Sequence, residues 1–152
     1  MSNIPKEIDT ISSLKLWTVL SRCYEATQVF VERTIAPDQL GFSDFMVLEV
    51  LLHKGPLTMS IIAQKVLRTN ASITSAIDRL EARKLVRREV SGADRRVWLI
   101  TLTEPGRHLI QSVFRSHKKQ MESLMAGLSQ EERRAMYVGL KKLGFEAKAR
   151  TS

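Results

Sequence analysis

The chain of 152 residues has little of what secreted, membrane-spanning or disulfide-bonded proteins require. Its single cysteine, Cys23, excludes an internal disulfide framework. No apolar run approaches the roughly 20 residues that span a bilayer. The first residues, MSNIPKEIDTISS, lack the basic and apolar regions of a signal peptide. These absences predict a cytoplasmic protein that has no membrane partner.

The residue types that build metal and catalytic sites are also sparse. The three histidines are scattered, and His108 and His117 fall on opposite faces of a predicted helix. The sequence contains no Gly-rich phosphate-binding loop and no recognisable arrangement of nucleophile and base. We therefore expect no enzymatic activity, no cofactor and no metal site within one chain.

Positive charge, in contrast, is abundant. Lys and Arg number 24 against 16 Asp and Glu, which gives a net charge of +8 and an isoelectric point near 10.0. Such an excess favours a polyanionic partner, and double-stranded DNA is the first candidate. An anionic membrane surface fits less well, because no predicted helix is both strongly amphipathic and lined by lysine.

Residues 58–103 carry the most specific pattern of the chain. Two short apolar stripes at helical spacing are formed by Ile62, Ala63, Val66 and Leu67, and by Ile73, Ala76, Ile77 and Leu80. Thr58 is placed to cap the first helix, and Thr69 or Asn70 the second. Residues 67–70 form the short connection between the two predicted helices, which is the spacing of a helix-turn-helix whose second helix presents its outer face.

Two strands are predicted directly after the second helix. Residues 86–90 and 97–102 are rich in β-branched and apolar side chains, and residues 91–94 form a turn signal between them. A hairpin in this position makes the segment a winged helix-turn-helix. The arginines that the wing offers to phosphates or to a minor groove are Arg87, Arg88, Arg95 and Arg96.

At these residues the chain resembles the MarR family of transcription regulators, from about Leu14 to Phe145. The residues that fit the family's D-x-R-x5-L-T wing signature are Asp94, Arg96, Leu102 and Thr103. Residues 77–81, IDRLE, are similar to the end of the family's recognition helix, and Gly106 fits its following glycine. Lys84 stands where the family usually has glycine. Since a left-handed helix end tolerates glycine better than lysine, we expect that corner to be built differently here.

The two ends of the chain are predicted to be helical, at residues 11–36 and 104–147. Ser12 or Ser13 can cap the first helix, and residues 129–132 form a capping box for the last. Their apolar stripes exceed what residues 43–103, the expected DNA-binding lobe, can cover, which favours a second copy as partner. The resemblance implies a homodimer formed through these helices. The expected fold class is mainly α with a small β-hairpin, a winged helix-turn-helix with N- and C-terminal dimerisation helices in a single domain, residues 1–152.

We expect DNA contacts from Thr58, Ser60, Asn70, Ser72, Ser75, Arg79, Asp94, Arg95 and Arg96. Asn70 and Ser72 lie in the half of the second helix that enters the major groove, and Arg79 shares its outward face. Thr58 and Ser60 can present hydroxyl and N–H groups to a phosphate, although ordinary capping also explains Thr58.

The resemblance assigns further roles at the wing. It implies that Arg96 reaches the minor groove and that Asp94 orients it by a salt bridge, while Arg95 contacts a phosphate. It also implies a repressor, and a two-fold dimer would bind a palindromic operator. A low-specificity architectural DNA-binding protein is the alternative that the residues leave open.

The resemblance further implies a small aromatic effector, bound between the dimer helices and the DNA-binding lobe. Candidates are Trp17, Tyr24 and His53, which combine aromatic surface with a polar group, and core packing is the competing interpretation of the first two. The sequence is most similar to the quinone- and phenol-responsive branch of the family. Cys23 offers a redox alternative, with a buried, inert thiol as the favoured interpretation. Because some members bind zinc, a site assembled across a dimer also stays open.

Overall fold

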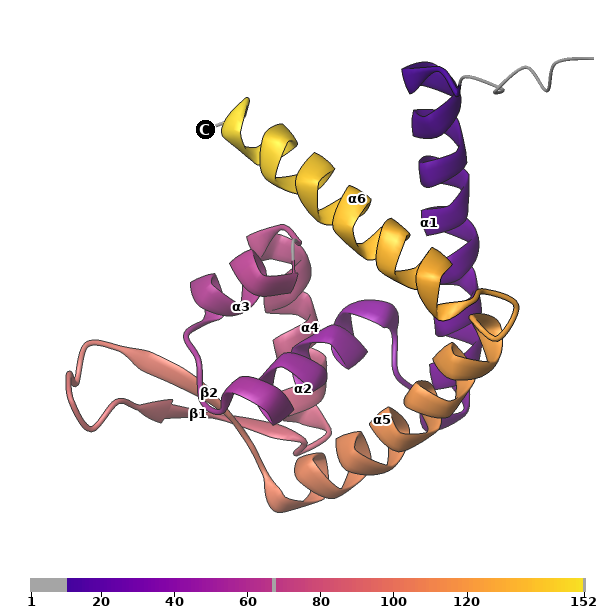
Figure 1. Cartoon of the computed structure of the whole chain (residues 1–152). Coiled ribbons are helices and arrows are strands. Elements are labelled where there is room, and N and C mark those ends of the chain that lie inside the picture. Colours follow the sequence, from indigo (N-terminus) through magenta and orange to yellow (C-terminus); the bar gives the residue numbers. More distant parts are fainter. Residues whose placement is uncertain (1–10, 67, 152) are drawn as a thin grey trace, which may run out of the picture. The chain divides into compact units, whose positions relative to one another are not determined.

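The computed structural model describes residues 11–66 and 68–151. Its elements are α1 (Ser13–Ile35), the 3-10 turn η1 (Ala36–Asp38), α2 (Phe42–Lys54), α3 (Met59–Val66), α4 (Asn70–Ala82), β1 (Val86–Val90), β2 (Trp98–Leu102), α5 (Glu104–Leu124) and α6 (Gln130–Ala149) (Figure 1). The predicted fold class, mainly helical with one β-hairpin, is confirmed. The expected contribution of Leu67 to the apolar stripe lies outside the described residues.

Short-range capping bonds fix the ends of the helices. The Ser12 hydroxyl accepts the N–H of Lys15 at 3.2 Å at the start of α1, so Ser12 rather than Ser13 is the cap. Thr69 caps α4 by accepting the N–H of Ser72 at 3.2 Å. Before α6, Ser129 and Glu132 form a reciprocal capping box, and the hydrogen bond from the Ser129 backbone lowers the pKa of Glu132.

The chain divides into two compact units, the first ending at Phe114 and the second beginning at Arg115. In the first unit α2 packs against α4, α3, β2 and α1, and the hairpin extends from this helical core (Figure 1). Fully buried side chains from these elements include Leu48, Leu51, Ile62, Ile73, Ile77 and Ile100. The described helices include none with the length and apolar character that crossing a bilayer requires.

The expectation that the corner at Lys84 is built differently is wrong. Lys84 adopts the left-handed conformation with a φ of 58°. Its N–H donates to the carbonyl of Glu81 at 2.9 Å, and the N–H of Leu85 donates to the carbonyl of Leu80 at 2.9 Å. This is the hydrogen-bond pattern of a Schellman motif. The two bonds, with Leu80 and Leu85 both buried, outweigh the steric cost of a side chain in this conformation.

Gly106 is required by a close approach between the beginning of α5 and the end of α4. A Cβ atom at this position would lie 1.9 Å from the carbonyl oxygen of Leu85. Thr103 holds the same junction, because its hydroxyl donates to the carbonyl of Lys84 at 2.6 Å and its N–H to that of Leu85 at 3.1 Å. The end of α4, the expected recognition helix, is therefore joined to the base of the hairpin and to α5 at one point.

Both ends of the chain expose apolar side chains. On α1 the large exposed ones are Leu14, Leu16, Trp17, Val19, Tyr24 and Val29. In the second unit they are Leu124, Met125, Met136, Tyr137, Val138, Leu140, Leu143 and Phe145. A single chain thus leaves apolar surface uncovered on α1 and, separately, on α6.

Candidate nucleic-acid interface

The first half of α4 presents short polar side chains. Asn70 and Ser75 are exposed, and the Asn70 carboxamide has no hydrogen-bond partner among the described residues. Ser72 is half-buried, and its hydroxyl lies 3.2 Å from the hydroxyl of Ser43 on α2. Of the three positions expected to contact DNA here, Asn70 and Ser75 are free to do so, whereas Ser72 also ties α4 to α2.

Arg79, on the same helix, is bound by a carboxylate. Its Nη2 atom lies 2.7 Å and its Nε atom 3.2 Å from Oδ1 of Asp44, whose side chain is 7% exposed. The other carboxylate oxygen of Asp44 accepts the N–H of Gly41 at 3.1 Å and caps α2. Asp44 therefore links the beginning of α2 to the recognition helix, a role that the sequence analysis did not assign to it.

Two of the four arginines expected to face DNA are instead paired within the protein. Arg88 on β1 donates to Asp78 at 2.7 Å and to Glu81, both on α4, and Arg87 pairs with Glu89. The hydrogen bond to Asp78, helped by the charge of Glu81, raises the pKa of the Arg88 guanidinium above its ordinary value. The sequence predicts that all four guanidinium groups are offered to phosphates or to a minor groove, whereas adjacent carboxylates hold these two.

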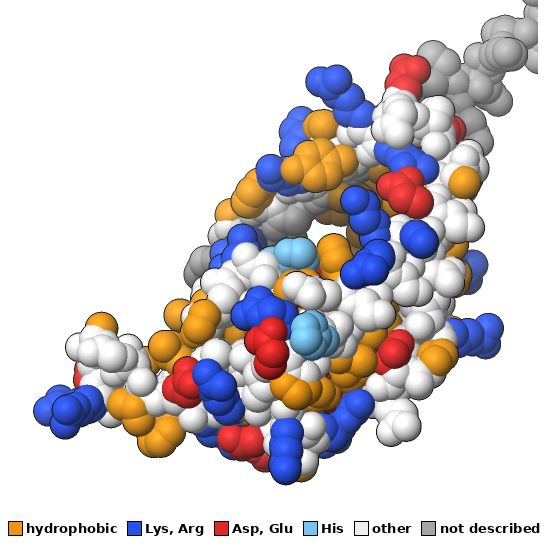
Figure 2. All heavy atoms as spheres, turned by 90° about the horizontal axis from the view of Figure 1, so that it is seen from below, with side chains coloured by type: hydrophobic (Ala, Val, Ile, Leu, Met, Phe, Trp, Pro, Cys, Tyr) orange, Lys and Arg blue, Asp and Glu red, His pale blue; other side chains and the backbone are white. Residues whose placement is uncertain are grey.

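The tip of the hairpin carries the two remaining arginines. Arg95 and Arg96 are exposed, and neither has an acidic partner within the part of the chain that the structure describes. Figure 2 shows Lys and Arg side chains at the end of this projection, at the left of the view. Asp94 accepts the backbone N–H of Arg96 at 2.9 Å. The expected salt bridge between Asp94 and Arg96 is absent from the described residues, because the carboxylate closes the turn instead.

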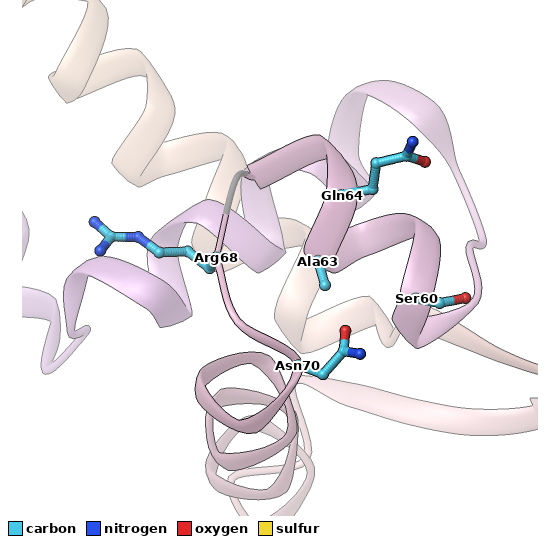
Figure 3. A pocket seen from close by; sticks show the side chains of 5 residues that line it. All are labelled: Ser60, Ala63, Gln64, Arg68 and Asn70. Atoms are coloured by element: carbon cyan, nitrogen blue, oxygen red, sulfur yellow. The ribbon is translucent and has the colours of Figure 1, made fainter. Parts of the chain in front are cut away.

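The beginning of α3 lies close to the beginning of α4. The Thr58 hydroxyl accepts the N–H of Ile61 at 3.3 Å as a cap and lies 3.3 Å from the hydroxyl of Ser60, which is exposed. A hollow of about 470 Å³ between the two helices is lined by Ser60, Ala63, Gln64, Arg68 and Asn70 (Figure 3). In this view the Asn70 side chain is directed toward α3 and Arg68 extends away from it, with its guanidinium 5.0 Å from the centre of the Phe42 ring.

Of the three effector candidates, two line one hollow of the described structure and the third does not line it. Trp17 and Tyr24 line an open hollow of about 470 Å³ together with Leu20, Ser21 and Glu25, all on α1. His53 lies instead at the end of α2. Its ring contacts Phe114 edge-on, with 4.7 Å between ring centres, and its Nε2 atom lies 3.8 Å from the Glu49 carboxylate.

Cys23 is exposed on α1, so the expectation of a buried thiol is wrong for the single chain. Cys23 is exposed because it lies on a part of α1 that the rest of the chain does not cover, as the exposure of neighbouring Tyr24 also shows. In residues 11–66 and 68–151, no three His, Cys, Asp or Glu side chains gather closely enough to hold a metal ion.

Known proteins are similar to this chain in the same winged helix-turn-helix segment and beyond it. A family model described as MarR family matches residues 38–97. The HTH-type transcriptional regulator MhqR of Bacillus subtilis is 37% identical over 139 residues, which cover 91% of this chain and 96% of that protein. The chain covers 96% of a relative with more than 30% identity, so the similarity extends well beyond the DNA-binding lobe.

Solved structures show the same fold. Bordetella bronchiseptica BpsR, whose DNA binding is regulated by 6-hydroxynicotinic acid, aligns with a TM-score of 0.77 and 29% identity over 86% of this chain and 98% of that one. The S. aureus MepR–DNA complex aligns with a TM-score of 0.74 and 22% identity over 90% and 99% of the two chains, which at this identity supports the fold alone. The matched relatives are regulators and not enzymes. The chain belongs to the MarR family and is a DNA-binding transcriptional regulator.

Proposed function

We propose that this regulator is a homodimeric repressor that binds a palindromic operator and is released by a small phenolic or quinone effector. The proposal is carried by the exposed polar face of α4 together with Arg95 and Arg96 at the wing tip, which have no carboxylate partner among the described residues. The first suits base edges in a major groove, and the second suits phosphates and a minor groove.

The role that we propose for each DNA-binding residue follows from its contacts in the structure. We assign Asn70 and Ser75 to base edges or nearby phosphates, since both are exposed on α4. Thr58 and Ser60 would direct hydroxyl and N–H groups at a phosphate, as would Arg95. Arg96 would enter the minor groove from the turn that Asp94 closes. Ser72 and Arg79 would act chiefly by holding α4 against α2, through Ser43 and Asp44.

The exposed apolar faces of α1 and α6 support the homodimer. Two copies related by a two-fold axis would cover these faces through residues 11–36 and 104–147, leaving residues 43–103 of each copy for DNA. The two recognition helices would then contact half-sites about one helical turn of DNA apart.

The effector proposal rests on the α1 hollow that Trp17 and Tyr24 line. BpsR, a structural relative, responds to 6-hydroxynicotinic acid, which is a hydroxylated aromatic molecule. A ligand seated on α1 would release DNA only if it binds better to a dimer whose recognition helices are wrongly spaced. His53 would join the site only if a second copy or a different arrangement brought it to α1.

One observation favours a second mode of release. Cys23 is exposed on α1, next to the residues of the α1 hollow, so an oxidant can reach its thiol in the single chain. A redox-sensing repressor would lose its oxidant response on Cys23→Ser while keeping any response to phenols.

The test is binding of the purified protein to the DNA upstream of its own gene, with excess random competitor, with and without a panel of phenols and quinones. We expect competitor-resistant binding that one of these compounds releases, and in Trp17→Ala or Tyr24→Ala the fraction of bound DNA that the compound releases should fall. If the random competitor removes the protein equally well from this DNA and from scrambled DNA, the result would contradict a repressor and favour an architectural protein. Binding that only an oxidant releases would replace the phenolic effector by Cys23.

A further inference from the structure

Trp98 is an unusually exposed aromatic side chain in the DNA-binding lobe. It begins β2, is 56% exposed, and pairs across the hairpin with Val90, which is 44% exposed. Trp17, the only other tryptophan of the sequence, lies on α1, where a second copy is proposed to pack. Because directly paired residues share one face of a hairpin, Trp98 and Val90 form an exposed apolar patch that another molecule can cover.

Trp98 is one of the residues that line a hollow of about 420 Å³, here called the wing hollow. Its lining residues are Thr58, Met59, Ser60, Asn70, Val97 and Trp98. They come from three places: the beginning of α3, the first residue of α4, and the start of β2. The wing hollow therefore lies where the recognition helix and the wing meet.

The wing hollow is lined both by apolar side chains and by side chains that carry hydrogen-bond donors. The Ser60 hydroxyl is close only to that of Thr58 among the described side chains, and the indole N–H of Trp98 has no acceptor in the same part of the chain. The carboxamide of Asn70 is likewise unpartnered. Both α3 and α4 begin here, so their first N–H groups add positive potential. None of the six lining residues is acidic.

A sugar–phosphate unit of DNA complements such a surface. Its anionic phosphate accepts hydrogen bonds, and its deoxyribose has an apolar face. In a duplex each sugar–phosphate backbone separates the major groove from the minor groove and borders both. With α4 in the major groove and Arg96 in the minor groove, the backbone between the two grooves must pass the junction of recognition helix and wing. That junction is the wing hollow.

We propose that the wing hollow binds one sugar–phosphate unit of operator DNA, with the Trp98 ring against the deoxyribose and with Ser60, Asn70 and the indole N–H directed at the phosphate. The inference rests on the DNA-binding surface proposed above and adds an uncharged contact to it. Trp98 would thus contribute affinity without reading sequence, because sugars and phosphates are common to every base pair.

The first test uses the chain's two tryptophans as a matched pair. Trp17→Phe leaves Trp98 as the only tryptophan, and Trp98→Phe leaves Trp17. On addition of operator DNA, the emission of Trp98 should shift and its quenching by acrylamide should fall several-fold, because DNA covers the ring. Trp17, on α1, should change little in the same titration.

The second test separates this contact from the charged ones. Trp98→Ala should weaken binding to operator and to random DNA alike, on the order of tenfold, as expected for loss of one buried aromatic contact. The slope of log affinity against log salt should stay unchanged, because no charge is removed. Trp98→Phe should retain most of the affinity. Val90→Ala, opposite Trp98 on the hairpin but outside the wing hollow, controls for damage to the hairpin, and the thermal midpoint of each variant checks its folding.

Three outcomes would overturn the inference. If the parent protein binds DNA while Trp98 stays equally quenchable and Trp98→Ala binds as tightly, the wing hollow does not hold DNA. If Trp98 becomes protected on adding a phenol, or on raising protein concentration without DNA, the wing hollow belongs to a ligand or to a second copy. If the parent binds no DNA even at low salt, the proposed function fails together with the inference. This outcome is distinguishable from the first one, in which the parent does bind DNA.

Discussion

The arginines of the recognition-helix region and those of the wing tip differ in what their guanidinium groups contact. Arg79 is held by Asp44, and Arg88 by Asp78 and Glu81, so these cations fasten α4 to α2 and to β1. Arg95 and Arg96 have no carboxylate partner among the described residues. Arginine count alone therefore overstates the charge available to DNA, because half of the wing's four arginines are neutralised by their neighbours.

The same comparison indicates different roles for the recognition helix and the wing tip in DNA binding. A helix held at several points presents Asn70 and Ser75 in a fixed register, which contacts to base edges and to the adjacent phosphates require. The wing tip supplies charge, which attracts any sequence and tolerates looser geometry. Four changes to the protein test this contrast, in order of decreasing expected effect on folding stability.

Gly106→Ala should disrupt the junction on which both parts depend. The added Cβ would meet the carbonyl oxygen of Leu85 at 1.9 Å, and backbone atoms cannot move aside as a side chain can. We expect a loss of about 3 kcal/mol in the free energy of unfolding, measured by urea denaturation. Gly92→Ala, where an added Cβ meets no atom within 4 Å, is the control. Equal stability of the two variants would show that the close approach does not exist.

Asp44→Ala should remove one fastening of the recognition helix. It deletes the cap on the Gly41 N–H and the partner of Arg79, for an expected loss of about 2 kcal/mol by the same measurement. Asp78→Ala is the matched control, because Asp78 is exposed and Arg88 keeps Glu81, so the loss should be about 0.5 kcal/mol. A larger loss for Asp78 than for Asp44 would reverse our assignment of the main fastening.

Lys84→Gly should stabilise the end of the recognition helix. Glycine adopts the φ of 58° without the steric cost of a Cβ, so we expect a gain of about 1 kcal/mol. Lys84→Ala removes the same charge and keeps the Cβ, and it should show no such gain. If both variants gain equally, the charge of Lys84 and not its backbone conformation is responsible.

Arg96→Ala should leave folding stability within about 0.5 kcal/mol of the parent, because the side chain has no partner in the described structure to lose. Its effect should be confined to DNA, with weaker binding to every sequence and a salt slope smaller by about 1. Thermal unfolding and DNA titration on one preparation check both parts. Weakening restricted to one operator sequence would mean that Arg96 reads bases.

Much of the fold was predictable because its signals are local. Ser12, Thr69 and Ser129 cap their helices through atoms three residues away, so the sequence alone locates these helix starts. The hairpin was predictable for the same reason, since β-branched residues flank a short turn. Of the predicted DNA-contacting residues, Ser60 lies on α3, and Asn70, Ser72, Ser75 and Arg79 lie on α4. Thr58 directly precedes α3, and Asp94, Arg95 and Arg96 lie between β1 and β2.

The electrostatic details were not predictable, because they depend on partners distant in sequence. Asp44 and Arg79 are 35 residues apart, and only the packing of α2 on α4 brings them together. Arg88 meets Asp78 and Glu81 because β1 turns back along the end of α4, through the corner at Lys84. In the sequence Trp98 is an ordinary aromatic residue of a predicted strand. Only the folded structure shows that it is exposed and lines a hollow together with Asn70.

The most direct test of the contrast is the salt dependence of DNA binding for matched arginine variants of one hairpin. Arg95→Ala and Arg96→Ala are compared with Arg87→Ala, whose guanidinium is already paired with Glu89. We predict that each of the first two lowers the slope of log affinity against log salt by about 1, and that Arg87→Ala leaves it at the parent value. An equal fall for all three, or none for any, would contradict the account.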